Sequence, residues 1–167
     1  ESVEDSLNFG RYSFSGLNPA QTLMNFAGTT VTYDKEMCET SRSHEDIFTV
    51  LKGHLGKRNQ YHPEGLPYFK AGAVGFFGYG NVELIEPTLK FSGNNDTIPD
   101  SIIGLFHDII VFDHLKHQIG IIVNVHIENN RTHNDFYSLA ERRIQEIKKQ
   151  LSSSGAKPEP FQITEYI

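Results

Sequence analysis

Apolar and polar positions alternate through the first third of the chain in the way that predicts β-strands. Residues 23–26 and 29–33 are rich in β-branched and aromatic side chains, and they flank Ala27-Gly28, a two-residue hairpin turn. Residues 34–42 are polar without alternation and predict a loop. The chain therefore opens with antiparallel strands.

Two segments carry a helical pattern instead. From Ser43 onward, apolar residues recur at four-residue steps, and Ser43 and Asp46 have the spacing of a capping box. Residues 134–151 carry a longer stripe with a period near 3.6 residues. That stripe consists of Phe136, Leu139, Ala140, Ile144, Ile147 and Leu151.

Between the two helical segments, the pattern returns to strands. Residues 102–106, 109–112 and 119–127 are apolar and β-branched, with a turn expected over 113–118. The glycine-rich run from Ala71 to Gly80 also predicts a strand, one whose missing side chains let a neighbouring backbone approach closely. Strands grouped apart from helices, with hairpin turns, indicate an α+β fold built on antiparallel sheets.

Composition and charge argue against some classes of function and partner. The 167 residues suit one ordinary domain, and the net charge of −6 argues against a nucleic-acid partner. Apolar runs fall short of the roughly 18 residues that a membrane helix needs, so we expect no membrane partner. The single cysteine, Cys38, fits a reducing compartment, and we expect a cytoplasmic protein.

Familiar catalytic and metal-binding patterns are missing from the sequence. The glycine run lacks the spacing of a dinucleotide or P-loop motif. His114 and His117 form an H-x-x-H pair in an expected turn, with no second ligand pair at zinc spacing, so we expect no metal in this chain. No nucleophile elbow is present. We therefore expect no catalytic residue in this chain.

The amino end has the residue types that bind a free amino acid. Glu1 and Ser2 lie upstream of Arg11-Tyr12-Ser13, which together offer acceptors for an ammonium group, donors for a carboxylate and an aromatic surface. On the residues alone, an exposed Glu1 and a solvated Arg11 are the simpler interpretation.

Several stretches, in order, resemble anthranilate synthase component I. Glu1-Ser2 resembles the end of its Leu-Leu-Glu-Ser motif, and residues 10–19 resemble the G-R-Y-S-F-x-G-x-x-P segment that follows. Residues 72–79 are similar to its G-A-V-G-Y-x-G-Y, and Phe112-Asp113-His114 to its F-D-H. The resemblance covers essentially the whole chain.

This resemblance implies a sandwich of antiparallel β-sheets with flanking helices. It implies that residues 1–151 are an amino-terminal regulatory domain and residues 152–167 a linker to an absent chorismate-binding catalytic domain. The intact enzyme would convert chorismate to anthranilate in tryptophan biosynthesis, with Mg²⁺ held in that absent domain. A glutamine amidotransferase subunit, component II, would supply ammonia.

In such an enzyme this domain helps to form the site for feedback inhibition by L-tryptophan, and the matching residues here are Glu1, Ser2, Tyr12 and Ser13. Two alternatives stay open. Aminodeoxychorismate synthase component I, an enzyme of folate synthesis, shares this domain. A stand-alone amino-acid-binding module would have the domain without an enzyme.

Overall fold

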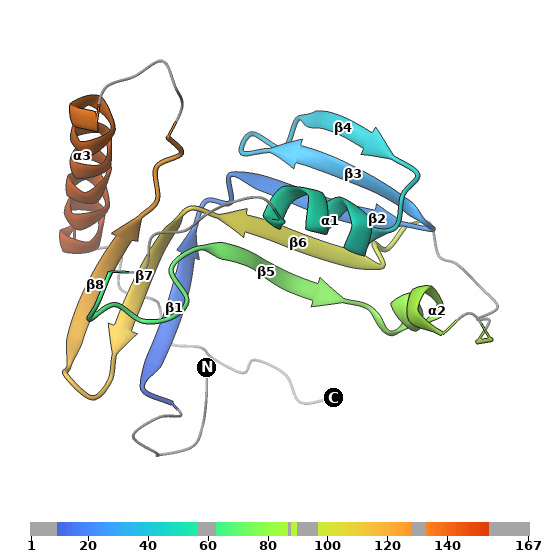
Figure 1. The fold of residues 1–167 in the computed structure, drawn as a ribbon, viewed down its shortest axis with the longest axis horizontal. Helices are drawn as coiled ribbons and strands as arrows, with labels where there is room; N and C mark the ends of the chain where they lie inside the picture. Colours follow the sequence, from blue (N-terminus) through green and yellow to red (C-terminus); the bar gives the residue numbers. More distant parts are fainter. Residues whose placement is uncertain (1–9, 57–62, 87, 90–96, 128–132, 154–167) are drawn as a thin grey trace, which may run out of the picture. The chain divides into compact units, whose positions relative to one another are not determined.

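The computed structural model describes residues 10–56, 63–86, 88–89, 97–127 and 133–153. The chain divides into two compact units, Glu1–His126 and Ile127–Ile167. In the described residues of the first unit, every strand pairing is antiparallel, and two helices and a short 3₁₀ helix accompany the sheets (Figure 1). The α+β class with antiparallel sheets is confirmed.

The larger sheet has five strands in the order β4-β3-β2-β6-β5. Its members are β2 (Gln21–Phe26), β3 (Thr29–Asp34), β4 (Glu39–Ser43), β5 (Gly72–Phe77) and β6 (Ser101–Phe106). The predicted hairpin is confirmed, because β2 and β3 pair directly and Ala27 and Gly28 both have positive φ.

The smaller sheet has three strands in the order β1-β7-β8. They are β1 (Tyr12–Leu17), β7 (Asp108–Asp113) and β8 (Gln118–Val123). The two sheets share two long stretches of chain, because β1 leads into β2 and β6 leads into β7 (Figure 1). These two stretches pair with each other twice, as β1 with β7 in the smaller sheet and as β2 with β6 in the larger sheet, and the chain bends between the two pairings.

An extra residue on one side produces the bend. Three residues, 18–20, separate the last pair of β1 from the first pair of β2, whereas only two, 106–107, lie opposite them. One additional residue in one strand of an antiparallel pair bends the ladder. The ring of Phe106 lies close to Gly16 and Gly104, where an added Cβ would be 2.5 and 2.8 Å from it. A side chain at either glycine would therefore force the ring of Phe106 to shift.

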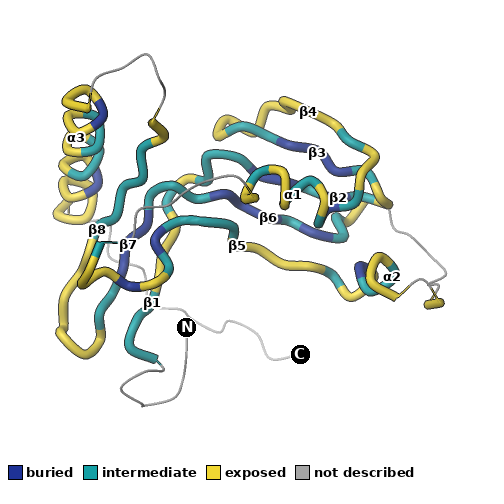
Figure 2. The backbone as a smooth tube through the Cα atoms, in the orientation of Figure 1, coloured by how far each residue is buried: buried dark blue, intermediate teal, exposed yellow. Residues whose placement is uncertain are grey.

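One face of the five-stranded sheet carries the main core. Leu23, Ile103 and Leu105 form one buried cluster with Ile47 of α1 (Ile47–Leu55), which is fully buried. Figure 2 shows dark-blue, buried segments along β2, β3 and β6. Fully burying such a side chain contributes about 1.5–3 kcal/mol. Asp46 caps the helix, because its carboxylate accepts hydrogen bonds from the backbone N and the hydroxyl of Thr49, at 2.9 and 2.6 Å.

Two predictions about this region were wrong. Residues 39–43, expected as the end of a loop and the start of a helix, form the edge strand β4, and the helix begins four residues later than Ser43. Nearly all of β4 is exposed, so neither of its faces needs apolar side chains. For that reason its pairing with β3 could not be predicted from an alternation of apolar residues.

The strand expected over 119–127 is shorter than predicted. β8 ends at Val123, and Asn124 follows it. Its side-chain amide donates to the carbonyls of Lys70 and His107, at 2.7 and 2.9 Å, and its backbone N also donates to His107. Asn124 thus fastens the end of β8 to the corner between β6 and β7.

The second unit contains α3 (His133–Ser152), which confirms the predicted carboxy-terminal helix. Phe136 and Ile147, two members of its apolar stripe, are buried. Residues 154–167, most of the expected linker, lie outside the described residues. No helix in the described ranges is both long enough and apolar enough to span a membrane.

The glycine-rich run forms β5, as predicted, and Gly75 shows why. A Cβ at Gly75 would overlap the carbonyl oxygen of Ile102 and lie 2.8 Å from the Cα of Ile103, on the neighbouring strand β6. The prediction of a close backbone approach is confirmed at this position. A three-residue 3₁₀ helix, η1 (Tyr79–Asn81), and the one-turn helix α2 (Val82–Ile85) follow the strand.

We therefore expect Gly75→Ala to lower the free energy of unfolding by about 1–3 kcal/mol, because the added methyl group must displace backbone. Gly53→Ala is the matched control, since a Cβ there meets nothing within 4 Å and α1 gains about 1 kcal/mol of helix propensity. Thermal melts of both variants check this. A Gly75→Ala protein as stable as the parent would contradict the close approach.

Candidate functional site

The residues that the sequence singled out lie at the start of β1. Tyr12 and Ser13 are its first two residues, and they lie opposite Asp113 and Phe112 of β7. Glu1 and Ser2 lie outside the described residues. The fold therefore brings two of the sequence motifs together, the Arg11-Tyr12-Ser13 segment and the Phe112-Asp113-His114 segment.

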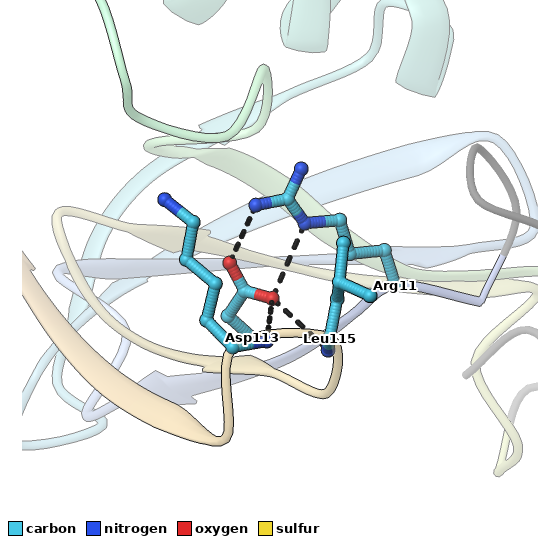
Figure 3. Close-up of polar contacts among 4 residues, drawn as sticks. Arg11, Asp113 and Leu115 are labelled. Carbon is cyan, nitrogen blue, oxygen red and sulfur yellow. Dashed lines mark hydrogen bonds and ion pairs between the residues drawn. The ribbon is translucent and has the colours of Figure 1, made fainter.

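An ion pair joins these two segments. The Nε of Arg11 donates to Oδ1 of Asp113 at 3.2 Å, and its Nη2 donates to Oδ2 at 2.8 Å (Figure 3). The pair bridges 102 residues of sequence and closes the end of the three-stranded sheet. A two-point contact fixes the orientation of both groups as well as their distance.

Asp113 also organises the turn between β7 and β8. Its Oδ1 accepts hydrogen bonds from the backbone N of Leu115 and of Lys116, at 3.1 and 3.0 Å. The hydrogen bonds from Arg11, followed by those from the turn amides, lower the pKa of Asp113 to about 2. The carboxylate is thus ionised at neutral pH and engaged on both oxygens.

Arg11 therefore already has partners within the fold. Its hydrogen bonds to Asp113 raise the pKa of the guanidinium, and the guanidinium carbon lies 4.7 Å from the ring centroid of Tyr12. In the sequence, Arg11 was a candidate donor for a ligand carboxylate or a solvated charge. In the structure it is a partly buried partner of Asp113 and Tyr12.

Ser13 has a partner that the sequence did not reveal. Its Oγ shares a hydrogen bond of 2.7 Å with Nε2 of His114, an exposed pair that joins β1 to the turn after β7. The backbone N of His114 donates to the carbonyl of Arg11 at 2.8 Å and so extends the ladder by one contact. In the sequence, His114 stood out only because it follows Phe112-Asp113. Its hydrogen bond to Ser13 depends on the pairing of β1 with β7.

Tyr12 and Ser13 lie on opposite faces of the sheet, because successive side chains of a strand alternate. Tyr12 lies beside Phe14, with ring centroids 6.2 Å apart, and Phe14 makes an edge-to-face contact with Phe69 at 5.3 Å. One face of β1 is therefore aromatic, and the other face presents the Ser13–His114 pair. A ligand that contacts both faces must lie at the open edge of β1, the outer strand of the sheet.

Asp113 does not orient His114 in the way that the acid of a catalytic triad does. A serine that attacks a substrate needs a histidine oriented by an acid, and the carboxylate of Asp113 bonds Arg11 and the turn amides instead. The aromatic residues and the hydroxyl–imidazole pair lie on opposite faces of β1, so only a small ligand at its edge, with one apolar and one polar end, could contact both.

The part of the chain that the structure describes contains no cluster of side chains that could bind a metal. No three histidine, cysteine, aspartate or glutamate side chains there could hold one ion together. His114 bonds Ser13, and His117 occupies the turn before β8 with a φ of 51°. The H-x-x-H pair therefore belongs to the hairpin between β7 and β8.

Comparison with known proteins finds relatives of this chain in one family. No family model matches the chain. The chain is 30% identical to anthranilate synthase component 1 of Acetivibrio thermocellus over 130 residues, which are 78% of this chain and 26% of that protein. It is 31% identical to the chloroplastic anthranilate synthase alpha subunit 1 of Oryza sativa subsp. indica over 164 residues, covering 92% of this chain and 28% of the subunit.

A solved structure has a similar fold. Anthranilate synthase component I from Streptococcus pneumoniae TIGR4 superposes with a TM-score of 0.56 at 23% identity, covering 89% of this chain and 32% of that protein. This likeness supports the fold alone. The chain spans only about a quarter to a third of the length of the proteins that it matches.

The Arg11–Asp113 pair makes stability depend on pH. Because folding lowers the pKa of Asp113 to about 2, its contribution is complete above the unfolded value near 4 and is lost as the pH falls toward 2. We expect Asp113→Asn to melt at a lower temperature than the parent at pH 7, with a difference that shrinks below pH 4.

Asp34→Asn is the matched control. The Oδ1 of Asp34 accepts from the turn amides of Glu36 and Cys38, as Asp113 does in its own turn, but no ion pair joins Asp34 to an arginine in the described chain. Melting curves from pH 2 to pH 7 compare the two variants. A difference between parent and Asp113→Asn that stays constant down to pH 2 would refute the assigned role of the ion pair.

Proposed function

The chain belongs to the anthranilate synthase component I family, and from this we propose that it is the amino-terminal, regulatory part of an enzyme that converts chorismate to anthranilate. The observation that carries the proposal is the match to the rice subunit along 92% of this chain, which is only 28% of that subunit. On this proposal, residues 1–151 are the regulatory domain and residues 152–167 lead into the catalytic domain.

The chemistry of the enzyme then belongs to the remainder of the polypeptide. Chorismate and Mg²⁺ would bind there, and a component II subunit would deliver ammonia from glutamine. In support, the described residues of this chain hold neither a group of three metal-ligating side chains nor an acid that orients His114. On this proposal, the domain acts by binding a ligand.

We assign L-tryptophan as that ligand, with Glu1, Ser2, Tyr12 and Ser13 in its site. An acidic side chain accepts hydrogen bonds from the ammonium group, hydroxyls donate to the carboxylate, and an aromatic ring packs against the indole. Because Arg11 is already paired with Asp113, the ligand carboxylate must be met by uncharged donors or by the remainder of the polypeptide.

The 167-residue chain alone should produce no anthranilate. Incubation with chorismate, Mg²⁺ and ammonia, followed by the fluorescence of anthranilate, should give a signal at background. Turnover that increases in proportion to the amount of this chain would contradict the division of labour that we propose.

In the intact enzyme, Ser2→Ala and Ser13→Ala should each weaken inhibition by tryptophan. A hydrogen bond to a charged group contributes roughly 1.5–3 kcal/mol, which corresponds to about a ten- to hundredfold change in affinity. The uninhibited rate should change little, because the reacting atoms lie elsewhere. Inhibition curves at fixed chorismate measure this effect.

Ser15→Ala is the matched control for Ser13, since Ser15 lies two residues along β1 on the same face and is exposed. It should leave inhibition unchanged. If Ser13→Ala and Ser15→Ala give the same inhibition curve as the parent, Ser13 is not part of the site.

A further inference from the structure

The hydrogen bond between Ser13 and His114 can run in either direction. The Oγ of Ser13 and Nε2 of His114 lie 2.7 Å apart, and a hydroxyl both donates and accepts. A neutral imidazole presents an acceptor or a donor at Nε2, depending on its tautomer, whereas an imidazolium presents a donor there in every case. Protonation of His114 therefore makes the Ser13 oxygen an acceptor toward the imidazole and leaves the hydroxyl proton for another partner.

The charges at the start of β1 do not direct this hydroxyl. The guanidinium of Arg11 donates to both carboxylate oxygens of Asp113. Asp113 is the register partner of Tyr12, so its side chain lies on the face of the sheet opposite to Ser13. Among the described residues, the hydrogen-bond partner of the Ser13 hydroxyl is His114.

Other titratable groups on the Ser13 face are few. By register, the described strands place on this face the side chains of residues 13, 15 and 17 of β1, 108, 110 and 112 of β7, and 119, 121 and 123 of β8. Asp108 is the charged residue among them, and it lies at the other end of the sheet. The turn after β7 adds the exposed residues Lys116 and His117. Histidine is the side chain that ordinarily changes its charge between about pH 5 and pH 8.

We propose that His114 is a positioning residue for the ligand carboxylate, because its imidazolium holds the Ser13 hydroxyl as a donor and so makes binding of tryptophan depend on pH. This inference rests on the proposed function. The ligand carboxylate stays ionised above about pH 4, so the charge that changes is on the imidazole. Tryptophan should therefore bind more tightly as the pH falls from 8 to 6, and bound tryptophan should in turn favour protonation of His114.

Inhibition of the intact enzyme by L-tryptophan at pH 6, 7 and 8 tests the proposal. Chorismate is held at its KM for each pH, so that changes in substrate binding do not enter the comparison. A hydrogen bond that involves a charged group is stronger than one between neutral groups. We therefore expect the inhibition constant of the parent to be roughly three- to tenfold higher at pH 8 than at pH 6.

Two variants separate His114 from the rest of the turn. His114→Gln places a side-chain amide near the same position, where it donates or accepts at every pH without changing charge. Tryptophan should still inhibit this variant, but equally at pH 6 and pH 8. His117→Asn is the matched control, because it removes the other histidine of the turn and asparagine tolerates the φ of 51° at that position. It should keep the pH dependence of the parent.

Proton uptake gives a second measurement that does not depend on turnover. Tryptophan is titrated into the intact polypeptide at pH 7 by calorimetry, in buffers that differ in their enthalpy of ionisation. The parent and His117→Asn should each take up a fraction of a proton on binding, and His114→Gln should take up none. Equal uptake by the parent and His114→Gln would overturn the proposal.

The inhibition curves distinguish a failure of this inference from a failure of the proposed function. A parent polypeptide that forms no anthranilate, or that tryptophan does not inhibit at any pH, contradicts the proposed function and this inference with it. A parent that tryptophan inhibits equally at pH 6 and pH 8 contradicts the role of His114 alone. The same conclusion follows if His114→Gln keeps the pH dependence of the parent.

Discussion

Two stretches of chain that pair with each other along both sheets determine this fold. Strand β1 continues into β2 and β6 into β7, and the bend between them results from one extra residue on the β1–β2 side. At this bend the ring of Phe106 packs close to Gly16 and Gly104. The start of β1, with Tyr12 and Ser13, and the open edge at β5 are therefore both anchored to β6–β7 and belong to one compact unit.

The sequence predicted those elements whose neighbours are close in the chain or whose burial is periodic. The hairpin around Ala27-Gly28, the helix after Asp46, the crowded strand at Gly75 and the long helix α3 all have local signals. Strand β4 has none, since its pairing depends on the backbone of β3. The partnerships of Arg11 with Asp113 and of Ser13 with His114 span about 100 residues, so only the sheet register reveals them.

The polar groups at the start of β1 divide between structure and binding. Arg11 and Asp113 satisfy each other and hold the turn, so they stabilise the position of Ser13 and His114 without offering a free charge. Tyr12 and Phe14 form the aromatic face of β1, on the side of the strand opposite Ser13. Glu1 and Ser2, which lie outside the described residues, would complete this site as proposed.

The proposed function requires above all that this chain is part of a larger polypeptide. The mass of the native polypeptide, isolated from its source with an antibody raised against this chain, tests that claim directly. Since 130 matched residues are 26% of the Acetivibrio relative, we expect a mass roughly three times the 18.9 kDa of this chain. A single native species of 18.9 kDa would contradict the proposed function.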